Sequence, residues 1–354
     1  MAHQLSYHEQ EDRKIYLKLR ELLKELPEYC RTYFRGIEPH TQSRTRLAYA
    51  YDLTVFFNYV INEFDPMTYK GLSPTELPLD VLDRITAQDI EEYMEYLKYR
   101  PDAANDAEVV NKEGGIKRKI SSLKSFYNYF YSAGLIQTNP ASKVRLPRIH
   151  EKEIIRLEYN EVARLLDEVD SGDKLSKKQQ EFHKKTRVRD LALLSLLLGT
   201  GMRISECVGI DMDDIDLEET AVNIHRKGGK EETIYFSDEV AKAVSDYYEE
   251  RKGIAACAGS ENALFLSLQN KRLSVRSAEN LVKKYASIAT PLKHITPHKL
   301  RSTYGTNLYR ETGDIYLVAD VLGHSDVNTT KKHYAAIDGD QRRRARKAVK
   351  LREV

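Results

Sequence analysis

A stretch without hydrophobic periodicity, from Val144 to Glu153, divides the chain into two parts of different character. The stretch contains Pro147 and comes shortly after the pair Asn139-Pro140, which is typical of a helix boundary. A chain of 354 residues with 41% hydrophobic side chains is too long for one small domain and can bury two cores. We therefore predict one domain over residues 1–146, a linker over 147–156 and a second domain over 157–354.

The first part has the apolar spacing of amphipathic helices. Apolar side chains recur at steps of three and four residues from Ser43 to Ile61 and again from Ile116 to Tyr131. Asp89-Ile90 begins a shorter helix, and the segment from Arg100 to Gly115 is predicted to be a loop. The first domain is therefore predicted to be a compact helical bundle.

The second part combines helices with one β-hairpin. Residues 221–225 and 232–236 alternate in polarity and are rich in residues that favour strands. The segment 226–230, RKGGK, joins them, and its paired glycines allow the positive φ of a tight turn. Helices are expected over 238–252, 275–289, 297–309 and 316–322. The predicted fold class is mainly α with a small β-sheet or hairpin (α+β).

The net charge of the whole chain is only +2, which does not by itself indicate a nucleic-acid partner. The last fourteen residues, 341–354, contain seven Lys or Arg and one Glu, so this tail carries +6 and the rest of the chain −4. The tail is either a solvated arm that binds only electrostatically or a helix that docks on a neighbouring protomer. We favour docking, because the apolar residues of the tail have helical spacing.

Cysteine usage and hydropathy restrict the compartment. The three cysteines, Cys30, Cys207 and Cys257, are widely spaced, which excludes a disulfide scaffold or a zinc ribbon and favours a reducing environment. The N-terminus lacks the apolar core of a signal peptide, and the most apolar run, Leu191 to Leu198, is far shorter than the roughly 20 residues that span a bilayer. We expect a soluble intracellular protein with no membrane partner.

Two cationic positions stand next to predicted helix ends. Arg203 follows the apolar helix that ends at Gly199-Thr200-Gly201, and a charge held so near a domain interior needs an anionic partner, although an ordinary surface arginine is the alternative. Thr296-Pro297 begins a helix on which His298 and Arg301 share a face, and a helix N-terminus attracts phosphate. A capping histidine beside a solvated arginine explains the second pattern equally well.

Two further positions lie near the end of the chain. Gly323 terminates a helix, so His324 is expected at the start of a loop. Asn328-Thr329-Thr330 begins another helix, and Tyr334 falls in its second turn. Tyr334 is one of 23 tyrosines, so its position alone says little about its role.

Taken together and in order, these residues resemble the tyrosine recombinase (phage integrase) family. The motifs that carry the resemblance are LLLGTGMRISECVGI, RKGGKEE, TPHKLRSTYGTNL, LGHSDVNTT and KKHYAAI. The front half is similar to the helical core-binding domain of that family in the segments SRTRLAYAYDLTVFFNYV, ITAQDIEEYMEYL and KRKISSLKSFYNYFYSAGLIQTNPASKVRLP. The length and the segment KKTRVRDLALLSLLLGTG look most like the single-acting Xer-type recombinases, which are XerS- or XerH-like.

The resemblance implies an enzyme that cuts and rejoins DNA through a 3′-phosphotyrosine, without metal, cofactor or ATP. It assigns the nucleophile to Tyr334 and the proton for the 5′-oxygen to Lys227, with Lys230 as the competing candidate. The remaining positions would hold the phosphate, through two guanidiniums and two imidazoles: Arg203, Arg301, His298 and His324. The histidines are not paired with cysteines or carboxylates at zinc-ligand spacing, so no metal site is expected.

One spacing departs from the family pattern. Tyr334 follows His324 by ten residues, whereas nine is the commoner family spacing, and Ala335-Ala336 follow it. One additional helical residue turns a side chain by about 100°, so the loop before Tyr334 must absorb the difference. The other tyrosines nearby, Tyr304, Tyr309 and Tyr316, lie on earlier predicted helices and fit the pattern worse.

The resemblance further implies a DNA clamp, with the core-binding domain on one side of the duplex and the catalytic domain on the other. Basic residues of the bundle helices would contact DNA: Arg44, Arg46, Lys117, Arg118, Lys119 and Lys124. A homo-tetramer on two DNA sites, a dimer per site, would form through the tail helix 341–354. A bacterial, cytoplasmic, nucleoid-associated protein is expected, with a DNA translocase as a further partner.

The role that the resemblance favours is Xer-type chromosome dimer resolution, in the service of chromosome partition and cell division. Alternatives are an integrase or invertase of a mobile element, a type IB topoisomerase, and a sequence-specific DNA-binding protein without enzymatic activity. The resemblance of the front half argues against the topoisomerase, and the presence of all six active-site residue types argues against a purely binding protein.

Overall fold

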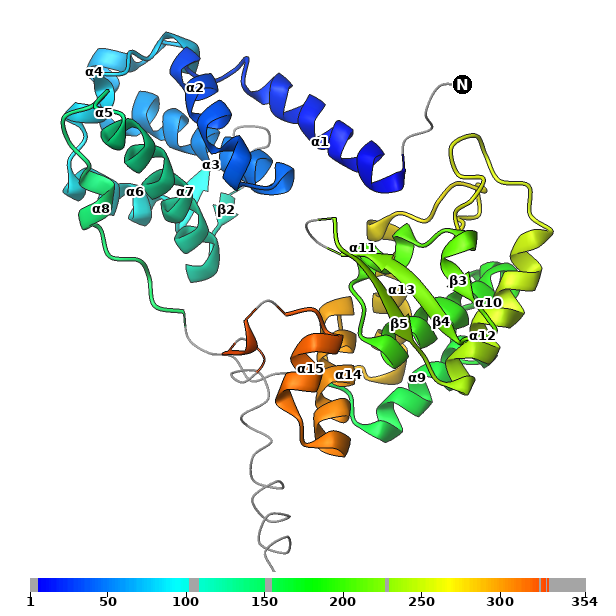
Figure 1. Cartoon of the computed structure of the whole chain (residues 1–354). Helices are drawn as coiled ribbons and strands as arrows, with labels where there is room; N and C mark the ends of the chain where they lie inside the picture. Colours follow the sequence, from blue (N-terminus) through cyan, green and yellow to red (C-terminus); the bar gives the residue numbers. More distant parts are fainter. Residues whose placement is uncertain are drawn as a thin grey trace, which may run out of the picture. The chain divides into compact units, whose positions relative to one another are not determined.

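The structure is a computed structural model that describes residues 6–101, 108–149, 155–226, 229–324, 326–328 and 330. The chain divides into two compact units, Met1–Glu151 and Lys152–Val354, and each has a hydrophobic core of its own. Most of the described residues are helical, and two small antiparallel sheets complete the structure (Figure 1). This confirms the predicted mainly helical α+β fold class. The expected domain bounds, 1–146 and 157–354, stay predictions.

The first unit is a helical bundle. Its α-helices are α1 (Tyr7–Leu22), α2 (Glu28–Ile37), α3 (Ser43–Tyr59), α4 (Pro66–Tyr69), α5 (Val81–Arg84), α6 (Ala87–Tyr96), α7 (Glu113–Ser132) and α8 (Pro140–Lys143). Two 3-10 helices, η1 (Glu38–His40) and η3 (Pro74–Glu76), and one π-helix, η2 (Val60–Phe64), lie between them. Aromatic rings fill its core: the ring of Phe126 in α7 lies 5.0 Å from that of Tyr33 in α2 and 6.0 Å from that of Phe57 in α3. These edge-to-face contacts join helices far apart in the sequence.

One expectation for this unit was wrong. The predicted loop from Arg100 to Gly115 contains most of a two-stranded antiparallel sheet, in which β1 (Tyr99–Pro101) pairs with β2 (Glu108–Val110), and α7 already begins at Glu113. Strands of three residues are too short to leave a recognisable alternation of polarity. Glycines in the first turn of α7 hid the start of that helix, because glycine is a poor helix former.

The second unit packs seven helices and a three-stranded sheet around the second core. The helices are α9 (Tyr159–Ser171), α10 (Lys177–Thr200), α11 (Ile204–Gly209), α12 (Asp238–Lys252), α13 (Val275–Ala289), α14 (Pro297–Thr312) and α15 (Ile315–Val321), counted over the described residues. A short turn, η4 (Met212–Asp214), leads into the sheet, whose antiparallel order is β3 (Ile215–Asp216), β4 (Ala221–His225) and β5 (Glu231–Tyr235). The predicted hairpin is confirmed, with its second strand one residue earlier than expected.

Helix α10 is the centre of the second unit and packs against α9, α12 and α14. Its C-terminal half is buried because nearly every residue from Leu191 onwards is apolar, as the sequence indicates. The helix ends at Gly201, whose φ of +65° is left-handed and which accommodates no side chain without strain. No helix within the described ranges is long and apolar enough to cross a membrane.

Candidate functional site

Arg203 is fixed in the turn between α10 and α11 by a carboxylate one helical turn further on. Glu206 is 6% exposed and accepts two hydrogen bonds from Arg203, one from its backbone N–H and one from its Nη1, both at 2.7 Å. The other nitrogen, Nη2, donates to the carbonyl of Gly323 at 3.5 Å. The guanidinium therefore points at the end of α15, and its orientation is set before any ligand binds.

Arg301 reaches the same place from α14. The residue is 6% exposed, and its Nη1 donates to the carbonyl of Gly201 at 2.7 Å while Nη2 donates to the carbonyl of Leu322. His298 lies one turn earlier on α14 and is exposed. Because carbonyls carry no formal charge, these two bonds leave the full positive charge of Arg301 in place.

A third arginine, Arg226, approaches from the hairpin. Its Nη2 donates to the carbonyl of Val321 at 2.7 Å. Three guanidiniums from three separate segments thus bind three successive carbonyls, at Val321, Leu322 and Gly323. The carbonyls at a helix C-terminus lack partners within their helix, and cations are favoured there by the helix dipole. The end of α15 therefore binds guanidinium groups from three separate segments of the second unit.

His324 directly follows Gly323, at the start of the loop after α15. Gly323 has a φ of +59°, its N–H donates to the carbonyl of Asp320 at 2.7 Å, and the N–H of His324 donates to the carbonyl of Ala319 at 2.9 Å. These two bonds form a Schellman motif, which ends α15 as the sequence predicts. The Nδ1 of His324 lies 2.7 Å from the hydroxyl of the buried Thr330. This hydrogen bond fixes the orientation of the imidazole ring.

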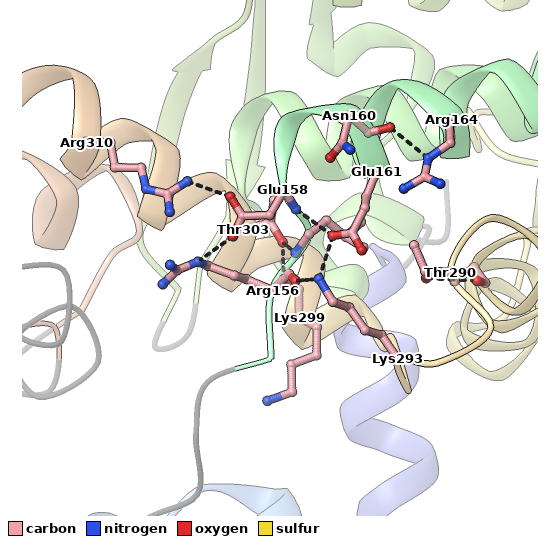
Figure 2. A network of polar contacts seen from close by, with 12 residues as sticks. Arg156, Glu158, Asn160, Glu161, Arg164, Thr290, Lys293, Lys299, Thr303 and Arg310 are labelled. Atoms are coloured by element: carbon pink, nitrogen blue, oxygen red, sulfur yellow. Dashed lines mark hydrogen bonds and ion pairs between the residues drawn. The ribbon is translucent and has the colours of Figure 1, made fainter.

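Helix α14 is held from its other side by the segment that begins the second unit (Figure 2). The backbone N–H of Leu157 donates to the hydroxyl of Thr303 at 2.9 Å, two residues beyond Arg301. Glu158 accepts from Arg310 at 3.0 Å, and Lys293 binds Glu161 at 2.5 Å. The hydrogen bond from Arg310 holds the pKa of Glu158 below its ordinary value. The helix that carries His298 and Arg301 is therefore tied down along its length.

Two other groups near the site are unsuited to act as nucleophiles. Cys207 is fully buried in α11, and burial raises the pKa of its thiol well above the ordinary value. Burial also raises the pKa of Tyr304 in α14. Both groups stay protonated at neutral pH, when a thiol and a phenol are weak nucleophiles. No cluster of three His, Cys, Asp or Glu side chains in the described part of the chain can hold a metal ion.

The structure thus brings together Arg203, Arg301 and the segment that leads to His324, with His298 on the same helix as Arg301. Lys227 and Tyr334 lie outside the described residues, as does the tail 341–354. The competing candidate Lys230 is exposed, and its carbonyl accepts from the backbone N–H of Arg226 at 2.7 Å. The catalytic roles assigned to these residues stay predictions.

Sequence reasoning missed the residues that hold the cluster in place: Glu206, Arg226, Glu232 and Thr330. Glu206 had a recognisable signal, because a carboxylate three residues after a helix start is typical of a capping box. Arg226 had none, since the carbonyl of Val321 that it binds lies on a segment that only the fold brings near. Glu232 and Thr330 lie six residues from their partners, Arg226 and His324, but no sequence pattern marks that spacing.

The six candidate DNA contacts of the first unit differ in their surroundings. Arg44 is exposed at the start of α3, whereas Arg46 is 8% exposed and binds the carbonyl and carboxylate of Glu38. Arg118 and Lys119 in α7 both pair with Asp52 of α3. Asp52 is buried, and burial raises its pKa while the two cations act in the opposite direction. The last two candidates are partly exposed in α7: Lys117, and Lys124, whose Nζ donates to the carbonyl of Val144 at 2.7 Å.

Comparison with known proteins links most of the chain to one family. The model of the phage integrase family matches residues 156–340. The tyrosine recombinase XerC of Caldanaerobacter subterraneus subsp. tengcongensis is 32% identical over 322 residues, which cover 88% of this chain and 83% of that protein. The tyrosine recombinase XerS of Streptococcus agalactiae is 28% identical over 354 residues, covering 92% of this chain and 96% of that protein.

Solved structures share the fold at lower sequence identity. The XerH recombinase in its post-cleavage complex with a palindromic difH substrate has a TM-score of 0.63 and 19% identity, covering 86% of this chain and 78% of that chain. The Tn1549 transposon integrase in complex with transposon right end DNA has a TM-score of 0.62 and 22% identity, covering 90% and 99%. The similarity therefore extends over both units of the chain.

Proposed function

Because the chain belongs to the phage integrase family, we propose that it is a site-specific tyrosine recombinase that cuts and rejoins double-stranded DNA at the cluster around the end of α15. The observation that carries the proposal is the convergence of Arg203 and Arg301 on the carbonyls of Gly323 and Leu322. Two planar guanidiniums held side by side match the non-bridging oxygens of a phosphodiester, a geometry that lysine does not reproduce.

The reaction needs no external energy, because one phosphate ester replaces another. The phenolic oxygen of Tyr334 attacks phosphorus, the bond from phosphorus to O5′ breaks, and its electron pair stays on O5′. The phenolic proton passes to a base, for which His298 is the candidate, while the ammonium of Lys227 gives its proton to O5′. A 3′-phosphotyrosine and a free 5′-hydroxyl result, and the reverse steps join the strand to a new partner.

Charge on the pentacovalent phosphorus is stabilised by the residues that the structure has already oriented. The guanidiniums of Arg203 and Arg301 supply fixed positive charge, and Nε2 of His324 donates a hydrogen bond. Groups that need no reorganisation at the moment of reaction contribute most to catalysis, and the loss of one such donor costs on the order of 10²-fold or more in rate.

We assign the chain an Xer-type role, chromosome dimer resolution, because its XerC and XerS relatives match it over nearly its full length. The substrate is then a chromosomal recombination site, bound by one dimer per site and paired with a second site in a tetramer. The two units clamp the duplex between them, and the protein acts on the nucleoid in the cytoplasm, where a DNA translocase brings two sites together.

A nicked suicide duplex tests the proposed chemistry. The duplex carries the binding site recovered from random DNA fragments with the full-length chain, nicked close to the cut so that the short 5′-product diffuses away. We expect the wild-type protein to accumulate a covalent protein–DNA adduct, which stays joined in a denaturing detergent gel and migrates there as a separate band. Tyr334→Phe binds the same duplex in a gel-shift assay but forms no adduct, since it lacks the attacking oxygen.

An adduct that persists in Tyr334→Phe would assign the nucleophile to another tyrosine. A wild-type protein that binds the duplex tightly but forms no adduct would favour the DNA-binding alternative over the recombinase.

A further inference from the structure

The backbone of Arg226 closes the turn of the hairpin, whereas its side chain also binds a residue outside the hairpin. Its N–H donates to the carbonyl of Lys230 at 2.7 Å, and its carbonyl accepts from the N–H of Gly229 at 3.2 Å. The side chain is only 6% exposed. A buried guanidinium in a turn whose described residues Gly229 and Lys230 are exposed needs a specific reason, because the loss of hydration is costly unless the charge is paired.

The guanidinium is held on two sides. On the hairpin, Glu232 of β5 presents both carboxylate oxygens to one edge of it: Oε2 lies 2.7 Å from Nε and Oε1 accepts from Nη2 at 2.7 Å. On the other side, Nη2 donates to the carbonyl of Val321, 95 residues away in sequence. Arg226 therefore joins the hairpin to the end of α15 through one rigid planar group.

The end of α15 is shaped to receive this group. A Cβ atom on Gly323 would lie 1.5 Å from Nη1 of Arg226 and 2.5 Å from its Cζ, so the guanidinium occupies the space that any other residue would fill. Within the described chain Nη1 has no hydrogen-bond acceptor. The guanidinium therefore lies directly against Gly323, in space that only a glycine leaves open.

We propose that Arg226 is a positioning residue that acts through its chain neighbour Lys227, holding the hairpin turn against the end of α15 so that the ammonium reaches O5′. The inference rests on the proposed function. Direct contact of Arg226 with the phosphate is the competing role, but Glu232 and the carbonyl of Val321 already take its Nε and Nη2, and Nη1 is packed against Gly323. A guanidinium held in this way is better suited to fix the position of the hairpin than to bind a phosphate.

The role predicts a defect in one chemical step, the protonation of the leaving oxygen. A substrate with sulfur in place of the bridging O5′ tests this step, because a thiolate leaves without a proton, the thiol pKa being near 8.5 in model compounds. We expect Arg226→Ala to cut the ordinary suicide duplex about 10–100-fold more slowly than wild type. On the 5′-phosphorothiolate duplex it cuts within a few-fold of wild type.

Four further variants serve as comparisons and controls for this result. Lys227→Ala shows the same rescue by sulfur, whereas Arg203→Lys is slow on both duplexes, since charge on phosphorus needs stabilising with either leaving group. Arg276→Ala makes the same change at an exposed position of α13, where the side chain is 81% exposed, and keeps wild-type rates on both. Glu232→Gln removes the charge partner but leaves Arg226 in place, and it reproduces the rescue with a smaller initial defect.

Sulfur rescue of both Arg226→Ala and Glu232→Gln supports the proposal. An Arg226→Ala protein that is folded by circular dichroism but slow on both duplexes would overturn it, and so would one that cuts the ordinary duplex at the wild-type rate. If Arg226→Ala does not fold, Glu232→Gln tests the proposal instead: slow cutting of both duplexes, or cutting of the ordinary duplex at the wild-type rate, would overturn it. A wild-type protein that forms no adduct with either duplex refutes the proposed function instead.

Discussion

At the scale of single residues, two of the three guanidiniums of the site are oriented by carboxylates close to them in sequence. Glu206 follows Arg203 by three residues, and Glu232 follows Arg226 by six. Each carboxylate fixes a planar fork and lowers the free-energy penalty of burying it. Both arginines therefore have a defined direction in the absence of DNA, and in the proposed mechanism the phosphate meets an Arg203 guanidinium that is already oriented.

The ion pair between Glu158 and Arg310 gives a prediction about pH. The hydrogen bond from Arg310 lowers the pKa of Glu158, so the folded state is stabilised at pH values above the ordinary glutamate pKa of 4.5, and this contribution is lost as the pH falls through the lowered value. Glu158→Gln should lower the melting temperature at pH 7 by about 1–3 °C, since a half-exposed pair contributes less than about 1 kcal/mol.

Thermal denaturation followed by circular dichroism, at pH 7 and at several pH values below 4.5, measures the difference in melting temperature between Glu158→Gln and wild type. The gap between Glu158→Gln and wild type narrows in acid, because the wild-type carboxylate is then protonated. Arg310→Gln removes the same pair from the other side and shows the same narrowing. A difference in melting temperature of equal size at neutral and acidic pH would show that the Glu158–Arg310 ion pair is not its cause.

At the scale of secondary-structure elements, the site depends on where two helices end. Helix α10 stops at Gly201, which places Arg203 and exposes the Gly201 carbonyl to Arg301. Helix α15 stops at Gly323, which presents three carbonyls and begins the loop of His324. Each helix end is therefore a structural part of the site and not only a connection.

Gly201→Ala tests the first of these ends. The new Cβ would lie 2.4 Å from Cδ1 of Tyr304 and 2.9 Å from Cδ2 of Leu322, and φ is +65°, so strain and overpacking act together. We expect a loss of about 1–3 kcal/mol in the free energy of unfolding, measured by urea denaturation. We also expect a loss of adduct formation, because the strain displaces the Gly201 carbonyl that Arg301 binds and the turn that carries Arg203.

Gly253→Ala is the matched control. Gly253 also follows a helix, α12, but its φ of −81° is ordinary for any residue, and the nearest atom to an added Cβ is the carbonyl oxygen of Glu250 at 3.4 Å. This variant should be as stable as wild type and fully active. Equal destabilisation by the two substitutions would rule out the special role of the α10 terminus.

At the scale of the whole molecule, the two units have separate cores, so either can pack without the other's side chains. In the proposed function, affinity for a duplex comes from phosphate contacts summed over both units, and we expect binding to depend steeply on salt. The proposed tetramer requires contacts between protomers in addition. The basic tail 341–354, which lies outside the described residues, is the segment we assign to these contacts.

Deleting residues 341–354 separates the two kinds of contact. We expect the truncated chain to bind a single half-site nearly as well as the full chain but to pair two sites poorly, because docking between protomers is lost while most phosphate contacts remain. Gel-shift titrations with one half-site and with two full sites measure the two affinities. An equal loss in both assays would show that the tail contributes only nonspecific charge.

The helices and the hairpin of the second unit were predictable because their signals are local. The predicted helices 238–252 and 275–289 coincide with α12 and α13, and Gly323 ends its helix as predicted. Each of these features depends on neighbours within four residues, through apolar spacing or a positive φ. The strands β1 and β2 escaped prediction because a pairing of three residues depends on the partner strand and not on its own pattern.

By itself, the sequence determined the helix positions, the order of the motifs and the kinds of chemical group available, since side-chain identity specifies these. Only the tertiary structure decided that Arg203, Arg226 and Arg301 meet on three successive carbonyls, 120, 95 and 21 residues away along the chain. A main-chain carbonyl is chemically the same at every residue, so no sequence pattern marks it as an acceptor. Packing alone selects it, by bringing one helix end within reach of the three guanidiniums.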